Sequence, residues 1–244
     1  MKNNKSVINV YKKNNIKSGV VTQLLYGENF KKIQNKGSWI KIKNDSDNYQ
    51  GFIKKKKFPP NHKNTHKVHS LYAELYLKPT SKSKIKTKLS FNSKIKVSQK
   101  KGAFYKFDSL WIRKSDLKEV KYKTKDIFKN IKKFLNKKYK WGGKHYSGLD
   151  CSALVQLFFN FNNKFCPRDT KDQIKYFKKK VKLNKIKKND LIFWKGHVAI
   201  AISQKEAIHA YGPFKKVVTM PIKKMIDKIY RTAKLKVIGV RRFS

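Results

Sequence analysis

The spacing of hydrophobic residues changes character about halfway along the chain. Before residue 120, apolar residues come in short alternating runs, the period of strands that bury one face. Between residues 6 and 58 these runs are interrupted at Gly27 and at residues 35–37 and 44–48, where Gly and Asn favour turns. The pattern predicts five or six strands forming a small barrel, which we place at residues 1–58.

A linker and a second barrel follow. Pro59 and Pro60 stop the last strand, and the basic, polar stretch over residues 59–67 is typical of a linker. Between residues 68 and 120 the cadence of short apolar runs returns, with aromatic residues in similar places. We therefore predict a second small barrel there, similar to the first in pattern more than in identity.

After residue 120 the pattern is first helical and then strand-like. Thr124 is placed to cap a helix, whose apolar stripe consists of Ile127, Phe128, Ile131, Phe134 and Leu135. Further helices are expected from Cys151, over residues 170–179 and after Pro221. Strands are expected at residues 190–194, 197–202, 207–210 and 236–242. Helices followed by an antiparallel sheet predict an α+β domain over residues 121–244.

One stretch of this domain has the features of a nucleophilic site. A Gly-rich loop leads to Asp150, Cys151 and Ser152, and an unbroken apolar run continues to residue 159. Cys151 therefore falls where a loop becomes a helix, and the free N–H groups and dipole of a helix start favour negative charge. With a protonated His nearby, the pKa of such a thiol falls from about 8.5 to below about 7.5. We predict that Cys151 is a reactive thiolate.

Two histidines are candidates for the base that this thiol needs. His197 opens a predicted strand after Gly196, and His209 lies in the next strand, beyond a tight hairpin around residues 203–206. Neighbouring antiparallel strands can hold two imidazoles side by side, one accepting the thiol proton and the other fixing its orientation. Taken alone, a His beside an apolar run is more often structural, so the combination with Cys151 carries this prediction.

These segments resemble the NlpC-type papain-like cysteine peptidases of bacterial cell-wall metabolism. The motifs follow that family's order, with Tyr-Lys-Trp-Gly-Gly at 139–143, Gly-Leu-Asp-Cys-Ser at 148–152, Pro-Arg-Asp-Thr-Lys-Asp-Gln at 167–173, Asp-Leu-Ile-Phe at 190–193, Gly-His-Val-Ala-Ile at 196–200 and Ile-His-Ala at 208–210. The resemblance implies a papain-like fold with Cys151 as nucleophile, His197 as base and His209 as third member.

The resemblance also implies that Tyr139 stabilises an oxyanion beside the backbone N–H of Cys151. The chain departs from the family's pattern at Ala153 and Asn189, which stand where Gly is common. Neither departure removes a reacting group.

The N-terminal barrel is similar to the first bacterial SH3-like barrel of γ-D-glutamyl-L-diamino acid endopeptidases of the dipeptidyl-peptidase VI type. Residues 23–28, 37–42 and 47–52 carry this likeness. In that subgroup the barrel caps the peptidase cleft, and one of its Tyr residues helps bind the free amino group of the substrate's L-Ala. Tyr49 occupies the matching position, and Phe52 replaces the commoner Trp. The resemblance thus implies two SH3-like barrels before the peptidase domain.

A pocket for an ammonium group needs hydrogen-bond acceptors and negative charge. Asp150, Ser152 and Tyr49 can supply them, and Glu28 adds a second carboxylate, while Arg168 can hold the α-carboxylate of D-Glu. Such a pocket should reject an N-acylated peptide, because Asp150 would lose its partner.

Structural roles compete with each of these assignments. Asp150 can cap the Cys151 helix and still bind the ligand. Tyr49 can be a core aromatic of the barrel. Arg168 can pair with Asp169 or Asp172 on the surface.

The net charge of +48 comes almost entirely from lysine, since there are only five arginines, at positions 113, 168, 231, 241 and 242. A protein that grips phosphates usually uses arginine forks as well. We therefore attribute the excess to a codon bias and expect no nucleic-acid partner. The charge is the only support for an alternative, a catalytically dead protein that binds wall polymers or nucleic acids.

The N-terminus is basic but lacks the apolar core and cleavage site of a signal peptide, and no apolar run is long enough to span a membrane. We expect a soluble, cytoplasmic protein with no membrane partner. Of the two cysteines, Cys166 is expected to be a buried hydrophobe. His62, His66 and His69 lie around the linker without Cys or carboxylate partners, so we expect no metal and no cofactor.

The sequence therefore predicts a thiol protease of murein recycling. It should hydrolyse the γ-D-glutamyl bond to meso-diaminopimelate or lysine in murein peptides with a free N-terminal L-Ala, through a thioester on Cys151. The alternative within enzymes is a hydrolase of intact or acylated peptidoglycan stems. The preferred diamino acid, the role of the second barrel and the oligomeric state stay open at this point.

Overall fold

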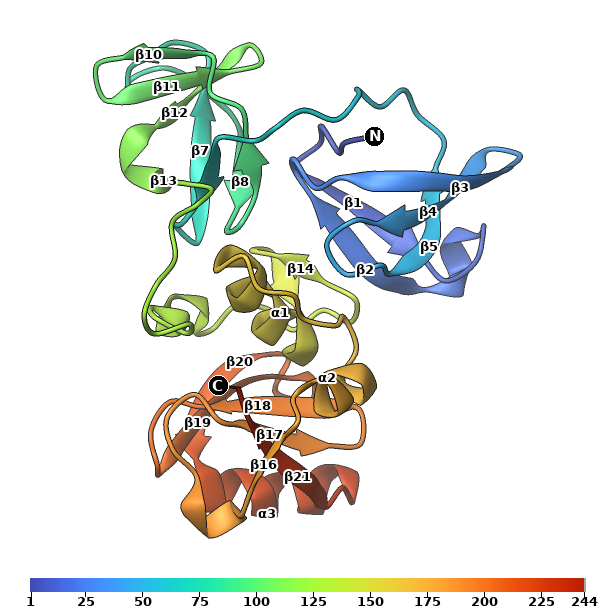
Figure 1. Ribbon diagram of the computed structural model, residues 1–244, viewed down its shortest axis with the longest axis vertical. Coiled ribbons are helices and arrows are strands. Elements are labelled where there is room, and N and C mark those ends of the chain that lie inside the picture. Colours follow the sequence, from blue (N-terminus) through green and yellow to red (C-terminus); the bar gives the residue numbers. More distant parts are fainter. Residues whose placement is uncertain (244) are drawn as a thin grey trace. The chain divides into compact units, whose positions relative to one another are not determined.

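A computed structural model describes residues 1–243 (Figure 1). The chain forms two compact units. The N-terminal unit contains residues 1–123 together with residues 144–146, and the C-terminal unit contains residues 124–143 and the chain from residue 147 onward. Each unit is built around its own β-structure, with helices in the C-terminal unit.

The first barrel is a five-stranded antiparallel sheet with the strand order β2-β1-β5-β4-β3. Its strands are β1 (Val7–Tyr11), β2 (Val20–Leu25), β3 (Phe30–Lys36), β4 (Trp39–Asn44) and β5 (Gln50–Lys54). Alternate residues of these strands point to one side and make its core, which consists of Val10, Leu24, Phe30, Ile40, Ile42 and Ile53. The alternating runs of the sequence therefore became the strands that they predicted.

The second barrel consists of two small sheets with the orders β10-β11-β12-β7-β8 and β13-β6-β9. Its strands are β6 (His66–Val68), β7 (Tyr72–Tyr76), β8 (Ile85–Ser90), β9 (Lys94–Ile95), β10 (Gln99–Lys101), β11 (Phe104–Phe107), β12 (Leu110–Arg113) and β13 (Leu117–Glu119). Strand β6 begins inside the stretch that the sequence assigns to the linker. Lys67 of this strand is fully buried although it is charged. Its Nζ donates to the carbonyls of Val120 and Tyr122 at 2.8 and 2.6 Å, and these bonds let a basic residue lie inside the barrel.

Within the N-terminal unit the two barrels meet at the turn that follows β2. The backbone N–H of Lys94 donates to the carbonyl of Tyr26 at 2.9 Å, and the Tyr26 ring packs edge-on against Phe107 at 5.5 Å. Gly27 lies at the centre of this contact with φ +79°. A Cβ atom at this position would come within 1.9 Å of the Lys94 carbonyl oxygen, so only glycine fits.

The C-terminal unit is an α+β structure around a six-stranded antiparallel sheet, in the order β16-β21-β17-β18-β19-β20. The strands are β16 (Lys179–Val181), β17 (Leu191–Trp194), β18 (His197–Ala201), β19 (Glu206–Tyr211), β20 (Lys216–Pro221) and β21 (Val237–Arg242). The helices are α1 (Cys151–Phe161), α2 (Thr170–Tyr176) and α3 (Ile222–Ala233). The short strands β14 (Lys144–His145) and β15 (Gly148–Leu149) precede α1. The chain also makes short 3-10 helices, namely η1 (Ile16–Ser18), η2 (Lys114–Asp116), η3 (Ile131–Phe134), η4 (Leu183–Lys185) and η5 (Gly212–Phe214).

Helices α1 and α3 cover the sheet of the C-terminal unit from different sides (Figure 1). Met225 and Ile229 of α3 share a core cluster with Ala199, Ala201 and Ala207 of the sheet. Helix α1 packs against β18 and β19, and all of its residues are buried. The strong apolar run that follows Cys151 is therefore explained by a helix that has no solvent-facing side.

Two predicted helices differ from the structure. No helix begins at Thr124, whose N–H and hydroxyl instead donate to the Asn162 side chain at the end of α1. Asn130 has a left-handed backbone with φ 64°, which ends helical continuity, and only the 3-10 turn η3 follows it. Helix α2 stops at Tyr176 because residues 179–181 pair with β21. Apolar periodicity placed buried residues correctly here but did not reveal these breaks.

Within residues 1–243, no helix is both long and apolar enough to cross a bilayer.

We expect Gly27→Ala to destabilise the N-terminal unit by about 2–4 kcal/mol, because the new methyl group meets backbone that cannot move aside. Gly37→Ala is the matched control, since Gly37 also has a positive φ of +57° but has open space around it. It should cost only about 1 kcal/mol from backbone strain. Chemical unfolding followed by circular dichroism measures both, and equal losses would contradict the packing argument.

Candidate active site

The start of α1 is held by a dense hydrogen-bond network around Asp150. Asp150 is the N-cap of the helix, and its Oδ1 atom accepts from the Ala153 N–H at 2.8 Å and from the Ser152 hydroxyl at 3.1 Å. Its Oδ2 atom accepts from the Gly142 N–H at 2.9 Å. The Gly-rich loop and the helix start are thereby fixed to one carboxylate, and Cys151 is the first helical residue after it.

Arg168 completes this network from the loop that precedes α2. Its guanidinium donates to both carboxylate oxygens of Asp150, at 3.0 and 2.6 Å, and to the Ser152 hydroxyl at 2.8 Å. Arg168 is only 2% exposed, so the surface pairing with Asp169 or Asp172 that the sequence left open is wrong. The structure shows this arginine as the buried counter-ion of Asp150.

His197 and His209 lie side by side on adjacent strands. Nε2 of His197 is 2.8 Å from Nδ1 of His209, and both side chains are buried. The ring of Tyr211 stacks on His209, with centroids 4.9 Å apart and planes at 17°. This stacking and the packing of Trp194 near His197 at 5.6 Å fix the orientation of the pair.

Cys151 lies against the beginning of β18, where its sulfur interacts with the backbone N–H groups of Val198 and Ser152. Burial nevertheless raises the pKa of the Cys151 thiol to about 12, with a further rise from the charge of Asp150. The same burial lowers the pKa of His197 to about 4. Burial therefore opposes the thiolate that the sequence predicts, because desolvation acts against the two N–H groups and the helix start.

Tyr139 belongs to the same neighbourhood. Its ring packs against Gly212, where an added Cβ atom would lie 3.5 Å from the ring. Its backbone N–H donates to the carbonyl of Lys215 at 2.8 Å. Burial raises the pKa of the Tyr139 phenol, and the nearby Cys151 and Asp150 raise it further. The hydroxyl therefore stays protonated at neutral pH and is available as a donor.

The comparisons with known proteins agree with this arrangement. Residues 136–236 match the NlpC/P60 family, and residues 10–58 match the bacterial dipeptidyl-peptidase SH3 domain. The C-terminal unit therefore contains an NlpC/P60 domain. These two matches confirm the predicted family, an NlpC-type domain that follows a bacterial SH3 domain, and with it the predicted fold class.

Two curated relatives extend the likeness. A dipeptidyl-peptidase 6 of Lysinibacillus sphaericus is 35% identical over 72 residues, 30% of this chain and 27% of that protein. A γ-D-glutamyl-L-lysine dipeptidyl-peptidase of Bacillus cereus is 25% identical over 239 residues, covering 82% of this chain and 70% of the relative. The chain therefore spans about a quarter of the first relative and just over two thirds of the second.

One solved structure has the same fold along almost the whole chain. The crystal structure of an NlpC/P60 family protein from Bacillus cereus superposes with a TM-score of 0.82 at 20% identity, covering 99% of this chain and 98% of that one. At this identity the likeness establishes the fold alone.

Glu28 and Tyr49, the other predicted binding residues, belong to the N-terminal unit. Glu28 is 5% exposed, and its carboxylate accepts from Nζ of Lys144 at 2.8 and 3.1 Å and from the Leu25 N–H at 2.8 Å. Tyr49 is half-buried between β4 and β5, with its N–H donating to Asp47. The Glu28 carboxylate is therefore already paired with the ammonium group of Lys144.

Two residues of the NlpC/P60 domain had no role in the sequence analysis. Gln173 of α2 donates from Nε2 to the carbonyls of Ser152 and Pro167, at 3.0 and 2.9 Å, and so joins the Arg168 loop to α1. Tyr211 stacks on His209. Sequence patterns that point to both residues exist. Gln173 is the last residue of the motif at 167–173, and Tyr211 lies two residues after His209, on the same face of the strand.

No group of three or more His, Cys, Asp or Glu side chains among residues 1–243 is arranged to hold a metal ion. The chemistry available at the described site is that of a thiol, two imidazoles and a phenol.

We expect Arg168→Met to destabilise the NlpC/P60 domain by about 3–5 kcal/mol, because Asp150 would remain buried without its counter-ion. Arg231→Met, which removes an exposed arginine of α3, is the matched control and should change stability by less than about 0.5 kcal/mol. Urea unfolding monitored by fluorescence measures both, and a small loss for Arg168→Met would show that the ion pair is not required.

Stability should fall as the pH is lowered from about 6.5 to about 4. The folded-state pKa values of His197 and His209 are about 4 and about 3, below the usual 6.5, because burial opposes protonation of both rings and a charge on His197 further opposes one on His209. The unfolded chain therefore binds protons that the folded chain does not, at about 1.4 kcal/mol per pH unit for each histidine.

His209→Gln should make that fall shallower by about 1.4 kcal/mol per pH unit. Urea titrations of both proteins at pH 6.5 and pH 5 measure the slopes. Parallel slopes would mean that the imidazole of His209 is protonated in the folded protein.

Proposed function

We propose that this protein is a cysteine peptidase that hydrolyses the γ-D-glutamyl bond to meso-diaminopimelate or lysine in murein peptides with a free N-terminal L-Ala. The observation that supports this most directly is the buried His197–His209 pair on the adjacent strands β18 and β19, the first of which begins beside Cys151, within an NlpC/P60 domain. Peptides of this kind are released when the cell wall is turned over, so the activity serves murein recycling.

The geometry supports a mechanism that starts from a neutral pair. Because Nε2 of His197 is bonded to His209, Nδ1 of His197 is the nitrogen left to accept the thiol proton. His209 then acts as an acceptor through Nδ1 and orients the imidazolium as it forms. Proton transfer coincides with attack on the glutamyl carbonyl, which is how a thiol of raised pKa becomes a nucleophile.

The tetrahedral intermediate needs donors for its oxyanion. The backbone N–H of Cys151, at the first turn of α1, and the protonated hydroxyl of Tyr139 are the candidates. As the intermediate collapses, His197 gives its proton to the leaving amine of the diamino acid, and a thioester remains on Cys151. Water activated by His197 then hydrolyses this thioester and restores the thiol.

The names of the relatives support a substrate with a free N-terminus. A dipeptidyl-peptidase removes two residues from a free N-terminus, and both curated relatives carry this name. The N-terminal SH3 match is to a domain of the same class of enzyme. These likenesses favour short peptides with a free amine over intact stems.

The structure changes the physical basis of that selectivity. Asp150 has Arg168, Ser152 and two backbone N–H groups as partners before any ligand arrives. It would therefore keep a counter-ion when an acylated peptide binds, contrary to the sequence-based expectation that it would be left without one. This neutralised carboxylate is also the observation that favours the alternative substrate, an acylated stem.

Hydrolysis of L-Ala-γ-D-Glu-meso-diaminopimelate by the purified protein tests the proposal, with the N-acetylated peptide as the comparison. We expect the free peptide to be cleaved at least ten times faster. Cys151→Ala should reduce the rate by more than about a thousandfold, since the thioester cannot form. Cys166→Ala, which removes the other buried thiol, should retain activity within about threefold.

Comparable cleavage of both peptides would support Cys151 as the nucleophile but would indicate that acylated stems are also substrates. Cleavage of neither would contradict the proposal as a whole.

A further inference from the structure

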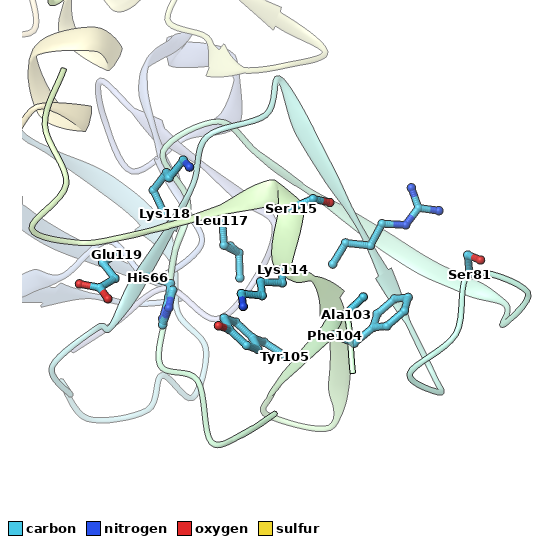
Figure 2. Close-up of a pocket in the computed structure, with 11 residues that line it drawn as sticks. His66, Ser81, Ala103, Phe104, Tyr105, Lys114, Ser115, Leu117, Lys118 and Glu119 are labelled. Atoms are coloured by element: carbon cyan, nitrogen blue, oxygen red, sulfur yellow. The ribbon is translucent and has the colours of Figure 1, made fainter. Parts of the chain in front are cut away.

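The second barrel contains a groove that the proposed peptidase chemistry does not use (Figure 2). It has a volume of about 810 Å³, within the size range of small-ligand sites. All of its lining residues lie between His66 and Glu119, so the groove belongs entirely to the N-terminal unit.

The floor of the groove is aromatic and aliphatic. Phe104, Tyr105 and Leu117 line it, and each is mostly buried, with its remaining exposed surface turned to the groove. Figure 2 shows Tyr105 between Lys114 and His66, with Leu117 close by. His66 meets the Tyr105 ring edge-on at 5.2 Å, and Nζ of Lys114 lies 6.0 Å from its centroid. This floor suits an apolar or aromatic side chain.

Arg113 provides a cation that no carboxylate among residues 1–243 hydrogen-bonds. It is paired in register with Phe104, and its guanidinium lies 5.3 Å from the ring of Tyr76. The nearby carboxylate of Glu74 instead accepts from the Tyr76 hydroxyl at 2.8 Å and pairs with Lys88 at 3.3 Å. The guanidinium is thus held in place by a ring while its donors stay available for a ligand.

The charges around the groove are of both signs. Arg113, Lys114 and Lys118 contribute three positive charges, and Glu119, which pairs with Lys121 at 3.2 Å near the surface, contributes one negative charge. His66 is neutral at pH 7, because burial lowers its pKa. Glu119 and His66 lie at one end, and Phe104, the register partner of Arg113, lies toward the other (Figure 2).

We propose that this groove binds a short acidic peptide. Its apolar or aromatic side chain lies on Tyr105 and Leu117, its carboxylates pair with Arg113, Lys114 and Lys118, and its amino group or N–H donors face Glu119. A ligand with both signs of charge fits this arrangement better than a nucleic acid does, since a continuous phosphate chain would pass the carboxylate of Glu119.

Calorimetric titration with the tripeptide Glu-Phe-Glu, with both ends free, tests the site. The full-length protein carries Cys151→Ala, so that no turnover obscures the binding heat. Arg113→Gln should weaken binding about tenfold, which corresponds to about 1.4 kcal/mol. Lys12→Gln removes the same charge from an exposed position of the first barrel and should leave the Kd within about twofold. The peptide Gln-Phe-Gln amide, which keeps the amino group but has no carboxylate, should bind at least tenfold more weakly than Glu-Phe-Glu.

Circular dichroism melting establishes that Arg113→Gln is folded. If it is not, Lys114→Gln at the exposed neighbouring position carries the same test, with about a threefold loss expected. Equal effects of the groove variant and Lys12→Gln would overturn the proposal, as would the absence of binding at millimolar peptide. A single-stranded oligonucleotide that binds more tightly than the peptide and depends on Arg113 would overturn it in favour of a nucleic-acid site.

Discussion

The ion pair between Asp150 and Arg168 is the interaction on which the described catalytic geometry depends. Asp150 alone caps α1, holds the glycine loop through Gly142 and binds the Ser152 hydroxyl, so its charge must remain buried beside Cys151. Only a second buried charge makes this tolerable, and Arg168 supplies it, with one guanidinium nitrogen donating to each carboxylate oxygen. The position of the nucleophile is thus set by an interaction between residues eighteen apart in sequence.

Burial has a second consequence, for the protonation state of the reacting groups. It raises the pKa of Cys151 and lowers that of His197, so the two groups are neutral together in the free protein. Such a pair forms its ion only when a substrate carbonyl and oxyanion donors are in place. A buried thiol that stays protonated is also less open to oxidation than a thiolate, because the thiolate is the reactive form.

Positive charge is used in different ways within this chain of net charge +48. Most lysines are exposed, and the fold does not account for their positions. A few lysines, in contrast, are held by specific partners. Lys67 is buried against two carbonyls, and Lys144 is buried against Glu28. At the groove of the second barrel, Arg113 and Lys114 instead lie near the aromatic rings of Tyr76 and Tyr105. Net charge alone therefore says little, since the surroundings of each cation decide what it does.

The sequence by itself determined most of the strands, the helix that begins at Cys151, the histidine pair and the family, because these depend on local periodicity and on motifs whose residues lie close together. It did not determine that Asn130 and its neighbours interrupt an apolar stripe, that Arg168 turns inward to Asp150, or that burial raises the pKa of the Cys151 thiol. These features depend on burial and on partners distant in sequence, and both exist only once the chain has folded. Desolvation in particular acts on every buried charge but leaves no local signature in the sequence.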